Sequence, residues 1–190
     1  MPTYTEEKFL QILSNYFSQM KLPTVPRVTM RLWYWRDKDR YSRDKELFSG
    51  PEYEADLLVI SNSGYLKEIE IKTNIQDFRA DFQKRHYHDH PEVRSFSYCL
   101  PSEIFNKHET EILSKCDFKG AGLILITEDG RIINKKKSVV RRYAHKLTNE
   151  AILHYLKLAA LKWCCFSYKP LIKNKITDDL DLGWSKWEQK

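Results

Sequence analysis

The chain has 190 residues, of which 42% are hydrophobic and 31% are charged, the composition of an ordinary globular protein. Its 32 Lys and Arg residues exceed its 26 Asp and Glu residues, and the formal net charge of +6 fits a polyanionic partner or a merely basic surface equally well. The first residues do not show a basic region followed by an apolar one, as a secretory signal would, and no apolar stretch has the length of a membrane span. We therefore expect a cytoplasmic protein. The four cysteines have neither metal-ligand nor disulfide-framework spacing, and we expect reduced thiols.

We expect one domain over residues 1–166 and a tail at 167–190. The first half should contain a helix that begins after Thr5 and ends before Pro23, because apolar residues recur there at helical spacing. Residues 27–36 are β-branched and aromatic, which predicts a strand. The remaining elements expected up to residue 73 are a polar loop at 37–53 and strands at 54–61 and 65–73.

The second half continues the same mixed pattern. Asn74 should cap a helix with Phe78 and Phe82 on its buried side. The expected elements are that helix to about residue 88, a strand at 95–100, a helix at 102–115, strands at 122–127 and 131–134, and a helix from Thr148 to about residue 166. The order α-β-β-β-α-β predicts an α/β fold, a mixed sheet with helices on both faces and an extra C-terminal helix.

Carboxylates and a lysine alternate on the two strands expected at 54–61 and 65–73. Because successive side chains on a strand point to opposite faces, Glu68, Glu70 and Lys72 should share one face. The turn-forming residues Ser61–Gly64 predict a hairpin, which would bring Asp56 beside Glu70. Two carboxylates can hold Mg²⁺ or Mn²⁺, and an ammonium can steady a phosphate. The same alternation also fits the wet face of an amphipathic strand.

Asp56 followed by Glu70-Ile71-Lys72 resembles the Asp…(Asp/Glu)-x-Lys signature of the PD-(D/E)XK nuclease superfamily. Three later segments, at 77–82, 96–101 and 122–127, resemble its small bacterial MmcB-like DNA-repair branch and phage relatives. The resemblance covers about residues 54–142, and Ala55 replaces the usual proline. It implies a restriction-endonuclease-like core and a Mg²⁺-dependent nuclease that acts on DNA in repair, recombination or phage-related processing.

That resemblance assigns roles to individual residues. Asp56 and Glu70 would be metal ligands with the backbone carbonyl of Ile71, and Lys72 would orient or help to deprotonate water, or stabilise the transition state. Lysine suits this role because its pKa falls readily on partial burial. Auxiliary candidates, each with an ordinary structural explanation, are Glu6, Glu7, Glu54, Glu68, Asp77 and Asp81. We expect Glu68 to be solvated and Asp81 to pair with Lys84 or Arg85.

Basic residues that could contact DNA fall into three places along the chain. They are Arg31, Arg36 and Arg40 among aromatic residues, Lys84 on the expected helix, and Lys135, Lys136 and Lys137 after the last strand. The run of His86, His88 and His90 lacks the spacing of a zinc site and is explained more simply as cations at a helix C-terminus.

Two other functions remain open. The fold could serve as a non-catalytic DNA-binding or assembly subunit, because a fold does not fix an activity. A protein-interaction module is the third possibility, with the C-terminal helix and the tail as a partner or homodimer surface.

Overall fold

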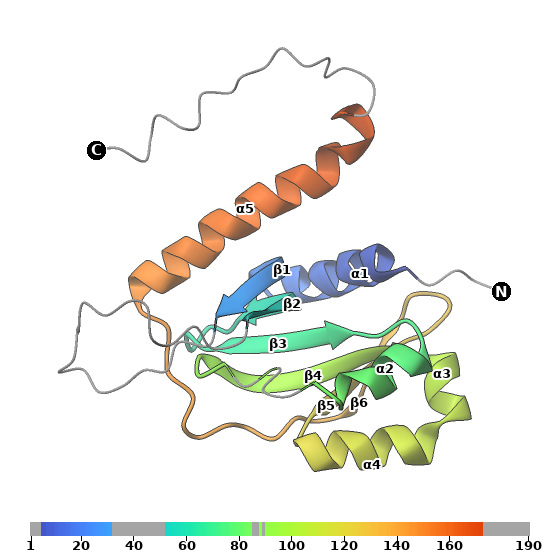
Figure 1. Cartoon of the computed structure of the whole chain (residues 1–190). Coiled ribbons are helices and arrows are strands. Elements are labelled where there is room, and N and C mark those ends of the chain that lie inside the picture. The colour runs from blue at the N-terminus through green and yellow to red at the C-terminus, as the bar shows by residue number, and fades with distance from the viewer. Residues whose placement is uncertain (1–4, 32–51, 85–87, 89, 173–190) are drawn as a thin grey trace, which may run out of the picture.

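The computed structural model describes residues 5–31, 52–84, 88 and 90–172, which form a mixed sheet flanked by helices (Figure 1). Six strands lie side by side in chain order, from β1 to β6. Their bounds are β1 Thr24–Arg31, β2 Glu52–Ile60, β3 Leu66–Ile71, β4 Val93–Pro101, β5 Gly122–Ile126 and β6 Ile132–Lys136. The expected mixed α/β class is confirmed.

The direction of pairing changes at β3. This strand pairs antiparallel with β2 and parallel with β4, and the parallel pairing continues to β5 before β6 returns antiparallel. The β2–β3 hairpin closes as expected, because Ser61 Oγ accepts a hydrogen bond from the Tyr65 amide at 3.0 Å. Gly64 completes the turn with a positive φ of 77°, which glycine adopts without a steric penalty.

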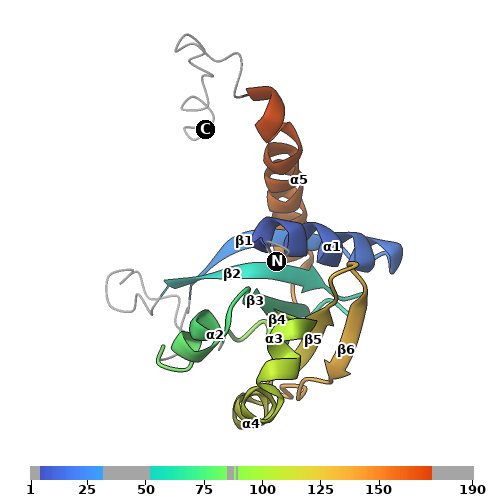
Figure 2. The same cartoon turned by 90° about the vertical axis from the view of Figure 1, so that its right-hand side faces the viewer.

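Helix α1, Glu6–Gln19, covers one face of the sheet. Thr5 caps it as expected, accepting from the Lys8 amide at 3.2 Å. The apolar side packs against Leu57, Ile69 and the neighbouring central strands. This contact fixes the N-terminus of α1 near the ends of β2 and β3 (Figure 2).

The opposite face is covered by α2 Ile75–Asp81, α3 Ser102–Lys107 and α4 Glu109–Lys119. Helix α2 ends earlier than the expected residue 88, because the amides of Phe82, Gln83 and Lys84 bond three residues back and tighten the last turn. The expected helix at 102–115 is two helices, broken at His108, whose ψ of 27° is not helical. Gly120 ends α4 in the left-handed conformation.

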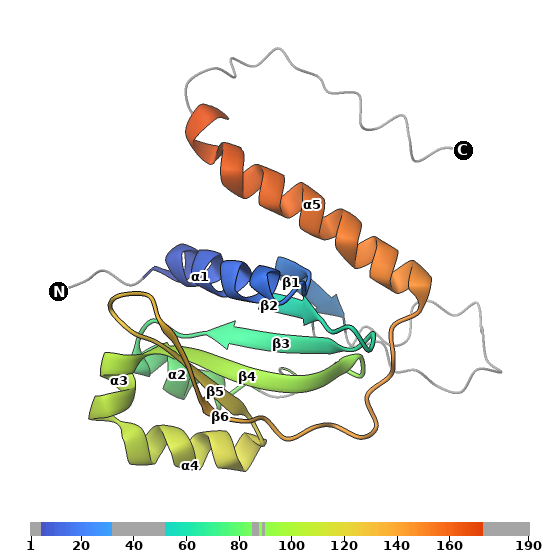
Figure 3. The same cartoon turned by 180° about the vertical axis from the view of Figure 1, so that it is seen from behind.

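Helix α5, Asn149–Ile172, packs along β1 at the sheet edge (Figures 1 and 3). Trp163 Nε1 donates to the Thr24 carbonyl at 2.9 Å, and Tyr155 and Ala159 of the same helix are buried in the core. The segment between β6 and α5 crosses the molecule and is tied to it by the Leu147 amide, which donates to the Gly64 carbonyl at 2.8 Å. Within the described residues no helix is long and apolar enough to cross a membrane.

Further boundaries differ from the expected ones, and α5 continues to Ile172 instead of ending near residue 166. Strand β1 begins at Thr24 and tolerates Pro26, because it is an edge strand. Expected strand residues beyond 31 and the expected loop to residue 51 lie outside the described part of the chain. Strand β6 extends to Lys136, so two of the predicted DNA-contacting lysines are strand residues rather than loop residues.

Candidate functional site

The β2–β3 hairpin brings Asp56 and Glu70 into one pocket. The ladder pairs Leu57 with Ile69 and Leu58 with Glu68, and Asp56 and Glu70 each lie one residue beyond its last pair. Asp56 Oδ2 accepts a hydrogen bond from the Ile71 amide at 2.7 Å, which fixes the carboxylate against β3. The predicted neighbourhood of the two carboxylates is therefore present.

Lys72 follows the last residue of β3 and is held there by both backbone and side chain. Its amide donates to the Cys99 carbonyl on β4 at 2.9 Å. Its ammonium lies 2.6 Å from Glu70 Oε1 and 3.4 Å from Asp81 Oδ1. Lys72 and Glu70 are both buried, so these are contacts in a low-dielectric setting rather than pairs on a wet strand face.

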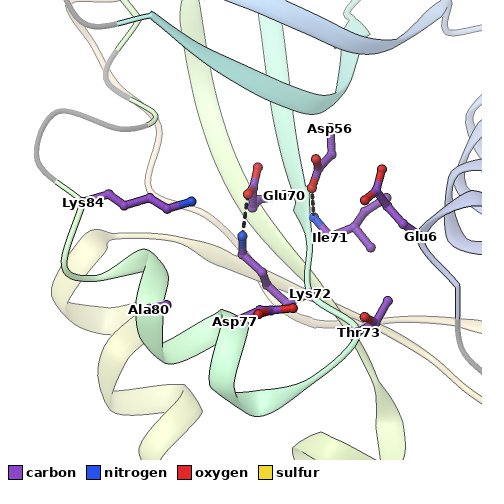
Figure 4. Close-up of a pocket in the computed structure, with 9 residues that line it drawn as sticks. All are labelled: Glu6, Asp56, Glu70, Ile71, Lys72, Thr73, Asp77, Ala80 and Lys84. Carbon is purple, nitrogen blue, oxygen red and sulfur yellow. Dashed lines mark hydrogen bonds and ion pairs between the residues drawn. The ribbon is translucent and has the colours of Figure 1, made fainter.

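These side chains line one pocket of about 220 Å³ beside the middle of β2 and the end of β3 (Figure 4). Helices α1 and α2 close its sides. The residues that line it are Glu6, Asp56, Glu70, Ile71, Lys72, Thr73, Asp77, Ala80 and Lys84. Three of the auxiliary or DNA-contacting candidates, Glu6, Asp77 and Lys84, thus lie with the central three residues.

The exposed side chains of Glu7 and Glu54 do not line the pocket. Glu54 was expected on the same face of β2 as Asp56. The regular alternation of side chains between the two faces of the sheet is interrupted in this part of β2, so the two residues do not share a face. Ala55 packs in the same core cluster as Leu58, although side chains three residues apart on a regular strand point to opposite faces. Arg27, opposite this point on β1, has a positive φ of 49°, which marks the local irregularity.

The pocket places two carboxyl groups close together in a largely buried setting. Burial, together with the neighbouring charge of Glu70, raises the pKa of Asp56 to about 8. Burial likewise raises the pKa of Glu70, in spite of the nearby His88 and Lys72. Glu70 Oε2 is buried without a hydrogen-bond partner among the described residues. An unpartnered buried carboxylate oxygen beside a second carboxylate is a fitting place for a divalent cation.

The expectation that burial would lower the pKa of Lys72 is wrong. Burial alone acts in that direction, but the carboxylates of Glu70 and Asp81 outweigh it and raise the pKa of the ammonium. Lys72 is therefore a fixed positive charge beside the pocket, and a role as a proton acceptor is disfavoured in this arrangement.

A buried polar network adjoins the pocket and was missed from the sequence. His88 contacts Glu68 through Nδ1 and Asp81 Oδ2 through Nε2, the latter at 3.1 Å. Tyr53 donates to Glu68 Oε2 at 2.8 Å, and Tyr98 donates to Asp81 Oδ2 at 2.5 Å. Glu68 and Asp81 have no exposed surface, so the expectation that Glu68 is solvated is wrong. The only signal was the histidine run itself, which carries no information about its partners.

The network also defines a second group with metal-ligand chemistry. Ligand atoms of Glu68, Glu70 and His88 lie within 4.8 Å of one another. Burial would lower the pKa of His88, but its hydrogen bonds to Asp81 and Glu68 raise it to about 9. A protonated imidazole bound at both nitrogens is a bridging cation between Glu68 and Asp81, so His88 and Glu68 have partners without a metal ion, whereas Glu70 Oε2 has none among the described residues.

The predicted DNA-contacting residues are spread over the surface. Lys84 reaches the pocket and lies 3.7 Å from Asp81 Oδ1, so its expected partner is confirmed. Lys135 pairs with Glu109 at 3.3 Å and Lys136 with Asp117 at 3.1 Å, on the far strand of the sheet, and Lys137 is exposed beside them. Arg31 ends β1, while Arg36, Arg40 and His86 lie outside the described residues.

The fold and the pocket together define a mixed α/β protein with a carboxylate-rich site at the strand ends. Residues 23–160 match the family described as "DNA repair protein MmcB-like". Because this match spans most of the chain, the protein belongs to the MmcB-like DNA repair family. No curated protein matches the chain.

One solved structure shares the fold. It is the SPO1766 protein of unknown function from Silicibacter pomeroyi, which is similar at 11% sequence identity with a TM-score of 0.55. The alignment covers 95% of this chain and 100% of that chain. At this level of identity the likeness concerns the fold alone.

Proposed function

We propose that this protein is a metal-dependent nuclease that hydrolyses DNA phosphodiester bonds, in keeping with its DNA repair family. The observation that carries the proposal is the convergence of Asp56, Glu70 and Lys72 in one pocket, with Glu70 Oε2 buried and unpartnered. A buried charged oxygen without a hydrogen bond is costly, and a cation bound at Glu70 would offset that cost.

Asp56, Glu70 and the Ile71 carbonyl would hold the cation, and three oxygen donors suit Mg²⁺ or Mn²⁺. When bound, such an ion neutralises phosphoryl oxygens and lowers the pKa of water. Residues of the chain would position the ligands and stabilise the transition state. Asp56 is oriented by the Ile71 amide, and the Lys72 ammonium lies where it can stabilise negative charge on the scissile phosphate.

Lys84 extends positive charge from the pocket to the surface. Its side chain is 43% exposed while lining the pocket, so it can contact a phosphate next to the scissile one. Its contact would be sequence-independent, because phosphates carry no base information.

Cleavage of linear, circular and single-stranded DNA, each with Mg²⁺, Mn²⁺ or EDTA, tests the proposal. We expect metal-dependent cutting that falls by about 10²- to 10³-fold in Lys72→Ala, the scale for loss of one group that stabilises transition-state charge. Glu128→Gln, which removes an exposed charge in the β5–β6 turn, should cut normally.

Cutting that survives both EDTA and Lys72→Ala would overturn the proposal. Salt-sensitive DNA binding without cutting would instead identify a non-catalytic DNA-binding subunit. The absence of both would leave the protein-interaction alternative.

A further inference from the structure

Asp81 is the buried carboxylate on which the polar contacts behind the pocket converge. Its side chain has no exposed surface. One oxygen, Oδ2, accepts from Tyr98 at 2.5 Å, from His88 at 3.1 Å and from Lys119 at 3.4 Å. His88, Lys72 and Tyr98 hold the pKa of Asp81 below its usual range in spite of its burial. A carboxylate bound from several directions cannot rotate freely, so its other oxygen has a fixed position.

That other oxygen, Oδ1, faces Lys72 at 3.4 Å. Lys72 therefore has two carboxylate neighbours, but only Glu70 lines the pocket, whereas Asp81 does not. If Glu70 shares its charge with a divalent cation, its hold on the ammonium weakens, because one carboxylate then serves two cations. Asp81 does not line the pocket, so it would keep its contact with Lys72 there, a contact that its Oδ1 shares with Lys84 at 3.7 Å.

We infer that Asp81 is a positioning residue that holds the Lys72 ammonium against the pocket while Glu70 is engaged in metal binding. The inference rests on the proposed nuclease function and deepens it. Tyr98 and His88 hold Asp81, and Glu68 with Tyr53 holds His88, so the chain of contacts connects Lys72 to β2, β3 and β4. The position of the Lys72 ammonium is thus connected, through Asp81, to side chains on three strands of the sheet.

The backbone of the segment after α2 supports this reading. His88 has a positive φ of 70°, which costs a non-glycine residue about 1 kcal/mol or more. Its ring stacks on Phe96 with centroids 4.2 Å apart and is 1% exposed. The strained backbone at His88 therefore places the imidazole between Asp81 and Glu68. A turn exposed to solvent would not require such strain.

A double-mutant cycle on the full-length protein tests the inference. Asp81→Asn keeps the shape of the side chain and removes its charge. We expect kcat for DNA cleavage to fall by about 10- to 100-fold with KM nearly unchanged, the range for loss of an outer-sphere partner. In the Lys72→Ala background the same substitution should reduce kcat no further, because Asp81 acts through Lys72.

Tyr98→Phe provides a second variant if Asp81→Asn folds poorly. It deletes one hydrogen bond to Asp81 and keeps the ring that packs on Phe78 and Phe96. We expect a smaller loss in kcat, about 5-fold for one hydrogen bond, again absent in the Lys72→Ala background. Tyr155→Phe is the matched control, since it deletes a comparable hydrogen bond to Glu92 under α5, far along the chain from the pocket.

Additive losses in the cycle, or an equal loss of kcat in Tyr155→Phe, would overturn the inference in favour of a general stability effect. If the wild type cuts no DNA, the proposed function fails, and crystal structures of the wild type and Asp81→Asn with Ca²⁺ then decide the positioning role. A displaced Lys72 ammonium in the variant would support that role, and an unchanged ammonium position would refute it.

Discussion

Replacing Asp56 with Asn should make the metal-free protein more stable and abolish its response to metal. The amide oxygen can still accept the Ile71 hydrogen bond, while the charge next to Glu70 disappears. The pKa of Asp56 is about 8, compared with 3.8 for an ordinary aspartate. At 1.36 kcal/mol per pH unit this shift corresponds to about 6 kcal/mol of unfavourable interaction. Water in the pocket screens part of it, so we expect a gain of about 1–3 kcal/mol in unfolding free energy.

The pH dependence of that gain has a definite sign. A group whose folded-state pKa is raised contributes stability that is lost as the pH rises from its unfolded to its folded pKa. Wild-type stability should therefore decline relative to Asp56→Asn between about pH 4 and pH 8, the interval set by the two values for Asp56, and the difference should level off above it. Urea denaturation of both proteins in EDTA, at a series of pH values, measures this directly.

Metal should reverse the order of stability. Mg²⁺ at 100 times its Kd would add about 2.7 kcal/mol to the wild type, which is about 5–11 °C in Tm for a domain of this size. Asp56→Asn should show almost none of this shift, and Glu128→Gln should show all of it. An Asp56→Asn protein that is less stable than the wild type in EDTA, or that keeps the full Mg²⁺ shift, would refute the reasoning.

Two further substitutions probe the parts of the fold that support the site. His88→Gln should destabilise the protein by about 1–3 kcal/mol below pH 6.5, because the charged imidazole bridges Asp81 and Glu68, and the deficit should shrink as the pH rises through about 9, the folded-state pKa. A deficit that stays constant to pH 10 in urea denaturation would contradict the bridging role. Gly122→Ala should cost about 1–3 kcal/mol, because its Cβ would lie 2.9 Å from the Ser138 amide and 3.1 Å from the Lys136 carbonyl, neither of which can move aside as a side chain can. Adding Ser97→Ala, which removes the nearby hydroxyl, should restore little of the loss in Tm, and full restoration would show that only the side-chain contact mattered.

The hairpin and the central residues could be predicted because they depend on short-range rules. The Ser61–Gly64 turn pairs β2 with β3 and so brings Asp56 near Glu70, and the Asn74 cap determines where α2 begins. The end of α2 could not be predicted, because no strong helix breaker stands between Asp81 and His88. Tertiary contacts of His88 in the core prevailed over local helix propensity there.

The burial of Glu68 and Asp81 was beyond sequence reasoning for a related reason. Each is an ordinary surface residue by type, and each is buried because partners from distant segments satisfy it. The Asp81 contact with Tyr98 depends on β4 lying parallel to β3, a pairing that no local pattern specifies. Whether Lys135, Lys136 and Lys137 contact DNA remains a prediction for binding measurements.

The change of pairing direction at β3 implies an order of assembly during folding. The β2–β3 hairpin joins neighbouring segments through a tight turn, whereas the parallel β3–β4 pair needs the whole crossover through α2, and local closures form faster than distant ones. Asp56 and Glu70 should therefore come together before Asp81 and His88 arrive behind Lys72. Hairpin substitutions should then change the folding rate, and substitutions around Asp81 should mainly change the unfolding rate. The carboxylates proposed to hold the cation would therefore come together first. The residues that hold the Lys72 ammonium would pack against them later.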